Sequence, residues 1–199
     1  MNSLYTAEQV KAFEKNTFVK KGDDLLAMME AANHSVDELI KTYPKSDFLI
    51  LCGPGNNGGD GYFIGIGLSK LNKSVKFLNV LEKSKKSRLC ECAFKKAKDL
   101  AFIAPSELKN VLIDTVIIDA IFGIGGRIKL SKQIEEILSF CNGFKSKVAI
   151  DIPTGLDSNT GEISKACFNA DKTITFIAYK LGQRINKGKN FSGKLILKD

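Results

Sequence analysis

The sequence predicts an α/β protein, built as a three-layer, doubly wound and mostly parallel sheet with helices on both faces and extra helices at the N-terminus. Two observations predict this fold. Short apolar runs alternate with helical segments along most of the chain, which is typical of βαβ units. Three of these runs end in loops that are rich in glycine and in oxygen-bearing side chains. The length of 199 residues fits a single domain over 1–199.

Two helices are expected before the first strand. Thr6 and Gln9 form a capping box, which predicts a helix that runs to about residue 20. Gly22 interrupts the pattern, and a second helix follows and ends before Pro44. The apolar residues of this second helix recur at helical spacing: Leu25, Met28, Met29, Ala32, Val36, Leu39 and Ile40.

The rest of the chain alternates between strands and helices. Each expected strand is a short apolar run, and each expected helix has apolar residues at helical spacing. Ser106 and Ser131 are expected to cap two of the helices. Strands are expected over 47–52, 74–80, 101–104, 115–121, 146–152, 172–178 and 194–198, and helices over 60–72, 87–100, 106–113 and 131–142.

The composition excludes several classes of protein. No apolar run approaches the roughly 18 residues of a membrane span, and residues 1–16 lack the apolar segment of a secretory signal. Five cysteines without a CxxC pair, and a single histidine, do not supply a zinc site or most catalytic triads. We therefore expect reduced thiols in a cytoplasmic protein, and a structural or exposed role for His34.

The net charge of +8 favours partners that bear phosphate, either nucleic acid or an anionic small molecule. The densest basic run, residues 83–88, has no interleaved aromatic residues. Such a run makes a poor base-reading surface, so we expect it to be solvated and do not expect nucleic acid as a partner.

The first glycine-rich loop, residues 53–61, follows the first long strand. Gly53, Gly55 and Gly58 match the spacing of the dinucleotide-binding fingerprint, with Glu82 as the acid that would meet a ribose. An NAD-dependent dehydrogenase is therefore one interpretation, although the chain shows neither a hydride-transfer site nor its usual proton donor. The Asn-Asn pair and Asp60 exceed what a phosphate-binding turn needs, and the absence of a following Lys-Ser/Thr excludes a P-loop.

Two further loops place acids at strand ends. Asp119 precedes a run of glycines whose Arg127 and Lys129 can meet phosphate oxygens. Asp151 ends another buried strand, whereas Asp157 fits turn chemistry. The carboxyl ends of parallel strands share one edge of a sheet, so these groups are expected to converge there. The converging oxygen-bearing residues are Asn57, Asp119, Asp151 and Thr154, a set that suits a hard cation or a proton-transfer site.

Taken together, the segments GPGNNGGDG, DAIFGIGGRIK and DIPTGLDSNTGE resemble the YjeF N-terminal domain family, whose enzymes are NAD(P)H-hydrate epimerases. The resemblance implies a Rossmann-like fold and the repair of hydrated NADH and NADPH, whose R and S epimers differ at C6 of the nicotinamide ring. It also implies a potassium ion held by Asn57, Asp119 and Thr154. The implied substrate-binding residues are Asn56, Asn57, Gly58, Gly59, Asp60, Gly123, Ile124, Gly125, Gly126, Arg127, Ile128, Lys129 and Asp151.

A strand-end carboxylate is a suitable general acid or base, so Asp151 is the first candidate for the catalytic group and Asp60 the second. The resemblance further implies a homodimer that works with an ADP- or ATP-dependent dehydratase, either separate or fused. Whether the chain is a stand-alone epimerase or one domain of a bifunctional enzyme is left open. The alternative is a non-catalytic scaffold or RNA-binding module of the same fold, although buried acids favour an enzyme.

Overall fold

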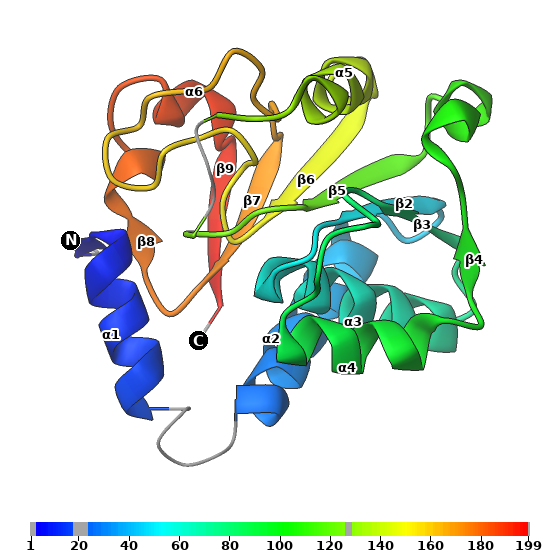
Figure 1. Cartoon of the computed structure of the whole chain (residues 1–199), viewed down its shortest axis with the longest axis horizontal. Coiled ribbons are helices and arrows are strands. Elements are labelled where there is room, and N and C mark those ends of the chain that lie inside the picture. Colours follow the sequence, from blue (N-terminus) through cyan, green and yellow to red (C-terminus); the bar gives the residue numbers. More distant parts are fainter. Residues whose placement is uncertain (1–2, 18–23, 126–128, 199) are drawn as a thin grey trace.

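The computed structural model describes residues 3–17, 24–125 and 129–198, and its centre is a seven-stranded sheet (Figure 1). The strand order is β4-β3-β2-β5-β6-β7-β9, and every neighbouring pair is parallel. The predicted α/β fold is confirmed. The strands are β2 (Phe48–Cys52), β3 (Val75–Asn79), β4 (Ala101–Phe102), β5 (Val116–Ala120), β6 (Ser146–Ile150), β7 (Lys172–Phe176) and β9 (Lys194–Lys198).

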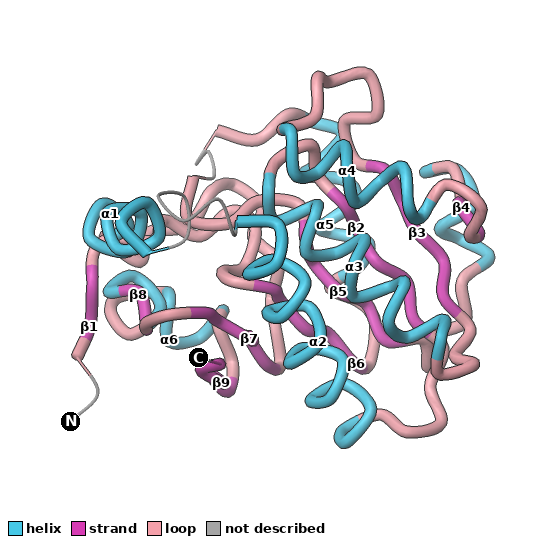
Figure 2. Tube along the Cα trace, turned by 90° about the horizontal axis from the view of Figure 1, so that it is seen from below, coloured by secondary structure: helices cyan, strands magenta, loops and turns pink. Residues whose placement is uncertain are grey.

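Helices cover both faces of this sheet, as predicted. The helices α2 (Asp24–Thr42), α3 (Asn56–Lys70) and α4 (Arg88–Ala97) pack on one face, which Figure 2 views from below. The helix α5 (Lys132–Cys141) and the 3₁₀ helix η2 (Pro105–Asn110) cover the other.

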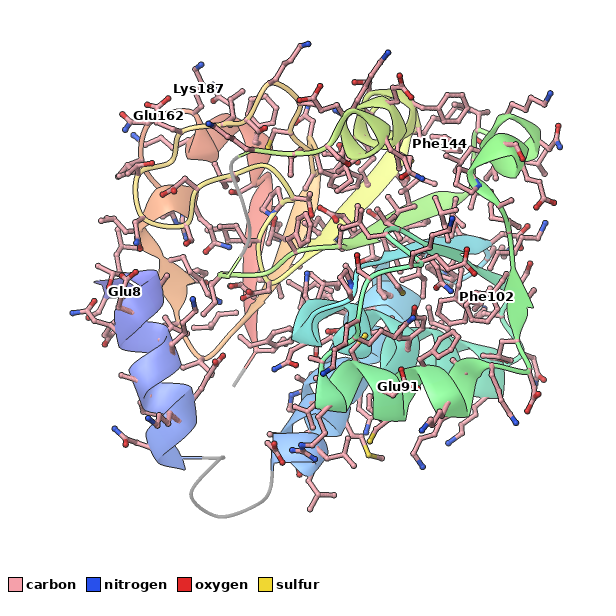
Figure 3. All side chains as sticks on the ribbon, viewed as in Figure 1. Glu8, Glu91, Phe102, Phe144, Glu162 and Lys187 are labelled. Carbon is pink, nitrogen blue, oxygen red and sulfur yellow. The ribbon has the colours of Figure 1, made fainter. Side chains whose placement is uncertain are left out.

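Successive residues of β2 show how one sequence builds two apolar layers. Ile50 belongs to the core under α2, α3 and α4, while Leu49 and Leu51 belong to the core under α5, because side chains alternate across a strand. Phe102 and Phe144 mark the two layers in Figure 3. Strands buried on both faces read as continuous apolar runs, which is why they were visible in the sequence.

The N-terminal helix α1 (Ala7–Thr17) stands apart from α2, α3 and α4 (Figure 1). A separate two-stranded sheet, in which β1 (Leu4–Tyr5) pairs with β8 (Tyr179–Lys180), fixes its start. The capping box is confirmed: the Thr6 N–H donates to Gln9 Oε1 at 2.8 Å and the Gln9 N–H donates to Thr6 Oγ1 at 3.3 Å. The predicted end of this helix and Gly22 lie outside the described residues.

Two predicted helix starts were wrong. The helix α3 begins at Asn56 rather than at Asp60, because its glycines allow close packing against the end of β2, and packing overrides their poor helix propensity. The helix η2 begins at Pro105, whose fixed φ suits a first helical position, so Ser106 is not its cap. Ser131 does cap α5, since its Oγ accepts from the Ile134 N–H. The sequence did not reveal β1, β8, η3 (Leu181–Gln183) or α6 (Gly188–Phe191).

The chain reverses its direction of travel across the sheet between β2 and β5. From β2 it moves outward to β3 and β4, then returns to β5 and continues the other way to β6 and β7. Open α/β sheets bind ligands in the crevice that such a reversal leaves at the carboxyl ends of the strands. The loops after β2, β5 and β6 all begin at this edge. Within the described chain, no helix is long and apolar enough to cross a bilayer.

Candidate active site

A cavity of about 510 Å³ lies at this edge of the sheet, a size typical of small-molecule sites. Of the predicted substrate-binding residues, Gly58 and Gly59 are buried in α3 and do not line the cavity, and Lys129 is exposed away from it. Gly126, Arg127 and Ile128 lie outside the described residues. The predicted residues that do line it are Asn56, Asn57, Asp60, Gly123, Ile124, Gly125 and Asp151.

The N-terminal part of α3 contributes Asn56 and Asn57 from its first turn, and Asp60 from the turn that follows, to the cavity. The Ser87 hydroxyl donates to Asn56 Oδ1 at 2.6 Å and orients that amide. The unpaired backbone N–H groups of a helix start, together with its dipole, favour anionic ligands. Glu82 does not line the cavity, so the residue expected to meet a ribose in a plain dehydrogenase is not at this site.

Asp119 is fully buried near the end of β5 and does not itself line the cavity. Its Oδ1 accepts hydrogen bonds from the Ile121 N–H at 3.1 Å and the Thr154 hydroxyl at 2.8 Å, and its Oδ2 accepts from the Thr154 N–H at 2.7 Å. Burial raises the pKa of Asp119 to about 6, although these hydrogen bonds oppose the rise. The ends of β5 and β6, which were expected to converge, are therefore joined by direct hydrogen bonds between Thr154 and Asp119.

Asn57 has the feature that a cation site leaves in a structure. Its Nδ2 donates to the Ile150 carbonyl at 3.1 Å, whereas its buried Oδ1 has no hydrogen-bond partner among the described residues. Buried acceptors are normally paired, so an orphaned one needs an explanation such as a bound ion. Thr154 Oγ1 accepts from the Phe122 N–H at 3.2 Å, which places the Thr154 hydroxyl against the loop that follows β5.

The donor types of this group fit a weakly charged, hard cation. Asn57, Asp119 and Thr154 offer an amide oxygen, one carboxylate and a hydroxyl, all of them oxygen ligands. A single carboxylate suits a monovalent ion better than a divalent one. Across the described ranges, no cluster of three or more His, Cys, Asp or Glu side chains could hold a metal ion.

Asp151 follows β6 directly and adopts a left-handed backbone conformation with φ of +67°. Such a conformation is unusual outside glycine, although Asp and Asn tolerate it better than most residues. Asp151 Oδ2 accepts from the Ile124 N–H at 3.0 Å, and Oδ1 accepts from the Lys180 ammonium at 2.5 Å. A Cβ on Gly123 would lie 2.6 Å from Asp151 Oδ2, so a glycine is needed for this approach.

Two other carboxyl groups line the cavity near Asp151. Burial, and then the negative charge of Asp151, raises the pKa of Asp60 well above its ordinary value. The same two causes raise the pKa of Glu14, which α1 contributes. The site therefore combines one ion-paired carboxylate with two carboxyl groups whose pKa values are raised.

Sequence reasoning did not place four residues at the site: Lys11, Glu14, His34 and Lys180. Glu14 and Lys11 line the cavity from α1, and His34 lines it from α2 with an exposed side chain. Lys180 reaches Asp151 from β8. The one sequence signal that Lys180 is buried was its position in the largely apolar stretch that follows the strand of 172–178. Asp157 takes the turn role predicted for it, since its Oδ1 accepts from the N–H groups of Asn159 and Thr160.

The geometry agrees with the comparisons with known proteins. A family model described as YjeF-related protein N-terminus matches residues 25–182. The chain belongs to this family. The YjeF-type segment contains all three strand-end loops and Lys180, whereas α1 with Lys11 and Glu14 precedes it.

Similar proteins of known name are NAD(P)H-hydrate epimerases. That of Leuconostoc mesenteroides is 31% identical over 204 residues, which cover 100% of this chain and 91% of the relative. That of Limosilactobacillus reuteri is 30% identical over 200 residues, which cover 98% of this chain and 94% of the relative. The crystal structure of yeast YNL200c superposes with a TM-score of 0.80 at 19% identity, covering 94% of this chain and 86% of the yeast chain, and supports the fold.

Proposed function

We propose that this YjeF-type protein is an NAD(P)H-hydrate epimerase, which interconverts the R and S epimers of hydrated NADH and NADPH at C6 of the nicotinamide ring. The observation that supports this most directly is the meeting of Asn57 and Asp60 from α3 with Asp151, which follows β6, in one cavity within the segment that the family model matches. Relatives about 30% identical, matched over nearly their whole length, are named for this activity.

The reaction needs one proton donor and one proton acceptor. C6 of the substrate is a hemiaminal carbon, bonded to a hydroxyl and to the ring nitrogen. Protonation of the hydroxyl lets water leave while the nitrogen lone pair forms a C=N bond, and water then adds to the other face and loses a proton. Asp60, with its raised pKa, is suited to donate the proton. Asp151, paired with an ammonium, is suited to accept one.

The same groups serve the alternative route through ring opening. In that route the C6–N bond breaks, the hydroxyl loses its proton to a base, and the ring nitrogen or its conjugated carbon takes a proton from an acid. The ring closes again after rotation about the bond to the new aldehyde. In either route, Asp151 after β6 would serve as the base and Asp60 in α3 as the acid, since both line the cavity.

Replacing Asp60 with asparagine tests the assignment of the acid. Asparagine matches the neutral form that burial favours at this position, so the fold is expected to keep its stability. Epimerisation is expected to fall by about 100-fold, because the proton donor is lost. The rate is measured by chromatography that separates the epimers, alongside thermal unfolding. Glu30→Gln, an exposed carboxylate at the rim of the same cavity, is the control and should keep the wild-type rate; equal rates for both variants would contradict the assignment.

A potassium ion is the proposed cofactor, held by Asn57, Asp119 and Thr154. The unpartnered Asn57 oxygen and the buried Asp119 carboxylate support this proposal. When bound, the ion would supply positive charge that compensates Asp119 and would tie together the loops after β2, β5 and β6. The chain's own residues carry out the proton transfers.

Potassium is expected to raise the thermal stability of the protein at pH 7.5 and to do so less at pH 5. Without a cation, the pKa of Asp119 in the folded state, about 6, exceeds the unfolded value of roughly 3.9, so stability falls as pH rises from about 4 to 6. A cation that compensates the carboxylate offsets this loss. A potassium concentration a hundredfold above its dissociation constant would stabilise the folded state by about 2.7 kcal/mol.

The measurement is thermal unfolding in potassium chloride and in tetramethylammonium chloride at equal ionic strength. Asp119→Asn is expected to remove the difference between the two salts, because no carboxylate then needs compensation. A melting temperature that is the same in both salts for the wild-type protein would contradict the site.

We also propose the biological setting of the enzyme. It would act as a homodimer in the cytoplasm and supply the S epimer to an ADP- or ATP-dependent dehydratase, so that all of the damaged cofactor can be recovered. The five free thiols support a reducing compartment. Size-exclusion chromatography with light scattering tests the dimer, and a coupled assay with a dehydratase tests the sequence of reactions.

The experiment that tests the function itself starts from the purified R epimer of hydrated NADH, abbreviated R-NADHX. The protein is expected to speed the appearance of the S epimer above the spontaneous baseline. A folded protein without this effect would overturn the proposal and favour a non-catalytic scaffold, for which a titration of RNA binding against salt is the next measurement.

A further inference from the structure

Lys180 is a lysine with almost no contact with solvent. Its exposed fraction is 1%, and it is among the largest fully buried side chains of the protein. Lysine is rarely buried to this extent unless it is paired. Its ammonium donates to Asp151 Oδ1 at 2.5 Å, to Thr175 Oγ1 at 2.7 Å and to the Phe176 carbonyl at 3.1 Å. All three protons of the ammonium are therefore used.

Asp151 accepts hydrogen bonds at both of its carboxylate oxygens and at its backbone carbonyl. Lys180 binds Oδ1, the Ile124 N–H binds Oδ2, and the Gln183 amide donates to the Asp151 backbone carbonyl at 2.8 Å. Gln183 Oε1 in turn accepts from the Lys180 N–H at 2.9 Å. Lys180 and Gln183 thus form one support around Asp151, built by β8 and the following 3₁₀ helix.

Lys180 does not line the cavity, whereas Asp151 does. The ammonium lies behind the carboxylate and has no free proton or exposed surface with which to meet a substrate. A direct role, such as attack by the amine on an open-chain aldehyde, would require it to leave all three of its acceptors. The arrangement instead suits a group that acts through Asp151.

We propose that Lys180 is a positioning residue for the epimerisation, one that compensates the charge of Asp151 and fixes its orientation so that this carboxylate serves as the base. The inference rests on the proposed epimerase function. Preorganised charge and hydrogen bonding of this kind fix a reacting group in place before the substrate arrives. The ion pair joins β8 to the end of β6, so the N-terminal pairing of β1 with β8 lies directly beside the catalytic support.

The test compares Lys180→Met, which has a similar length and no charge, with Lys147→Met. Lys147 is a second buried lysine, 8% exposed, whose ammonium donates to the Phe144 carbonyl at 2.8 Å and lies 3.6 Å from Asp171. It does not line the cavity. Both variants lose a buried ammonium, so both are expected to lose stability. Only Lys180→Met is expected to lower kcat, by about 100-fold, with KM for R-NADHX changed by less than about threefold.

A double variant separates positioning from a structural role. Lys180→Met combined with Asp151→Asn is expected to be no slower than Asp151→Asn alone, because Lys180 acts only through Asp151. Losses that multiply in the double variant, or a kcat of Lys180→Met within about threefold of the wild-type value, would overturn the proposal.

Stability provides a readout that does not depend on activity. The double variant is expected to unfold at a higher temperature than either single variant, since it leaves no unpaired buried charge. Absence of this coupling would overturn the ion pair and with it the positioning role. A wild-type protein that does not epimerise R-NADHX would overturn the proposed function and the role of Lys180 in it, while the coupling in stability would still be seen.

Discussion

Replacing Asp151 with asparagine is expected to slow epimerisation by about 10²- to 10⁴-fold, the range that a positioned general base contributes. The amide cannot accept the proton that the carboxylate accepts. It also cannot reproduce both hydrogen bonds of the carboxylate, because its NH₂ group would face either the Ile124 N–H or the Lys180 ammonium. The loss is expected in kcat more than in KM.

The backbone is expected to tolerate this change. Asparagine adopts the left-handed conformation of position 151, with φ of +67°, as readily as aspartate does. Stability should nevertheless fall, because the buried Lys180 ammonium loses its counter-charge; removing one partner of a buried pair costs about 3–5 kcal/mol. The rate is therefore measured below the melting temperature of the variant, with circular dichroism as the check on folding.

Asp157→Asn is the matched control, since Asp157 belongs to the same sequence motif but holds the turn of residues 157–160. It does not line the cavity, and its replacement should leave the rate of epimerisation unchanged. An Asp151→Asn protein that is folded and epimerises at the wild-type rate would remove Asp151 from the mechanism. Asp60 or Glu14 would then be the remaining candidates for the base.

The sequence predicted the residues that reach the site through local connections. Asn57, Asp119 and Asp151 each lie at or just beyond the end of an apolar strand, and parallel strands bring their carboxyl ends to one edge without any further information. Their convergence could be expected from the order of strands and helices alone. The same logic predicted the two apolar layers, because buried parallel strands are continuous apolar runs.

The residues that sequence reasoning missed reach the site through long-range pairing. Lys180 and Glu14 depend on β1 and β8, two-residue strands with no periodic pattern that pair across more than 170 residues. The Ala7 N–H donates to Asn159 Oδ1 at 2.7 Å, which adds a second long-range contact for α1. Contacts of this kind leave no signal in the hydrophobic periodicity of either segment.

The start of α3 was missed for a different reason, and it leads to the second large effect. Gly58→Ala is expected to destabilise the protein by about 3 kcal/mol or more, although alanine is normally favoured over glycine in a helix by about 1 kcal/mol. A Cβ at Gly58 would lie 1.9 Å from the Gly53 carbonyl oxygen. Both atoms belong to the backbone or are fixed to it, so no change of rotamer relieves the contact.

Gly55→Ala, three residues away, is the matched control. Gly55 precedes the first turn of α3 with φ of −86°, and a Cβ there would meet nothing within 4 Å. Its replacement should cost less than about 1 kcal/mol, the difference between glycine and alanine at an N-cap. Urea denaturation of both variants measures the two free energies of unfolding, provided that the slope of the free energy against urea concentration is the same in both.

The difference in free energy of unfolding between Gly58→Ala and Gly55→Ala measures how closely α3 approaches the end of β2. Each variant adds the same methyl group to the same glycine-rich segment, and only the methyl group at position 58 meets the Gly53 carbonyl. Epimerisation should fall with stability in Gly58→Ala, because the N-terminal part of α3 also places Asn57 and Asp60 in the cavity. Equal stability of the two variants would contradict the close approach of α3 to the end of β2. It would also contradict the placement of Asn57 and Asp60, which depends on that approach.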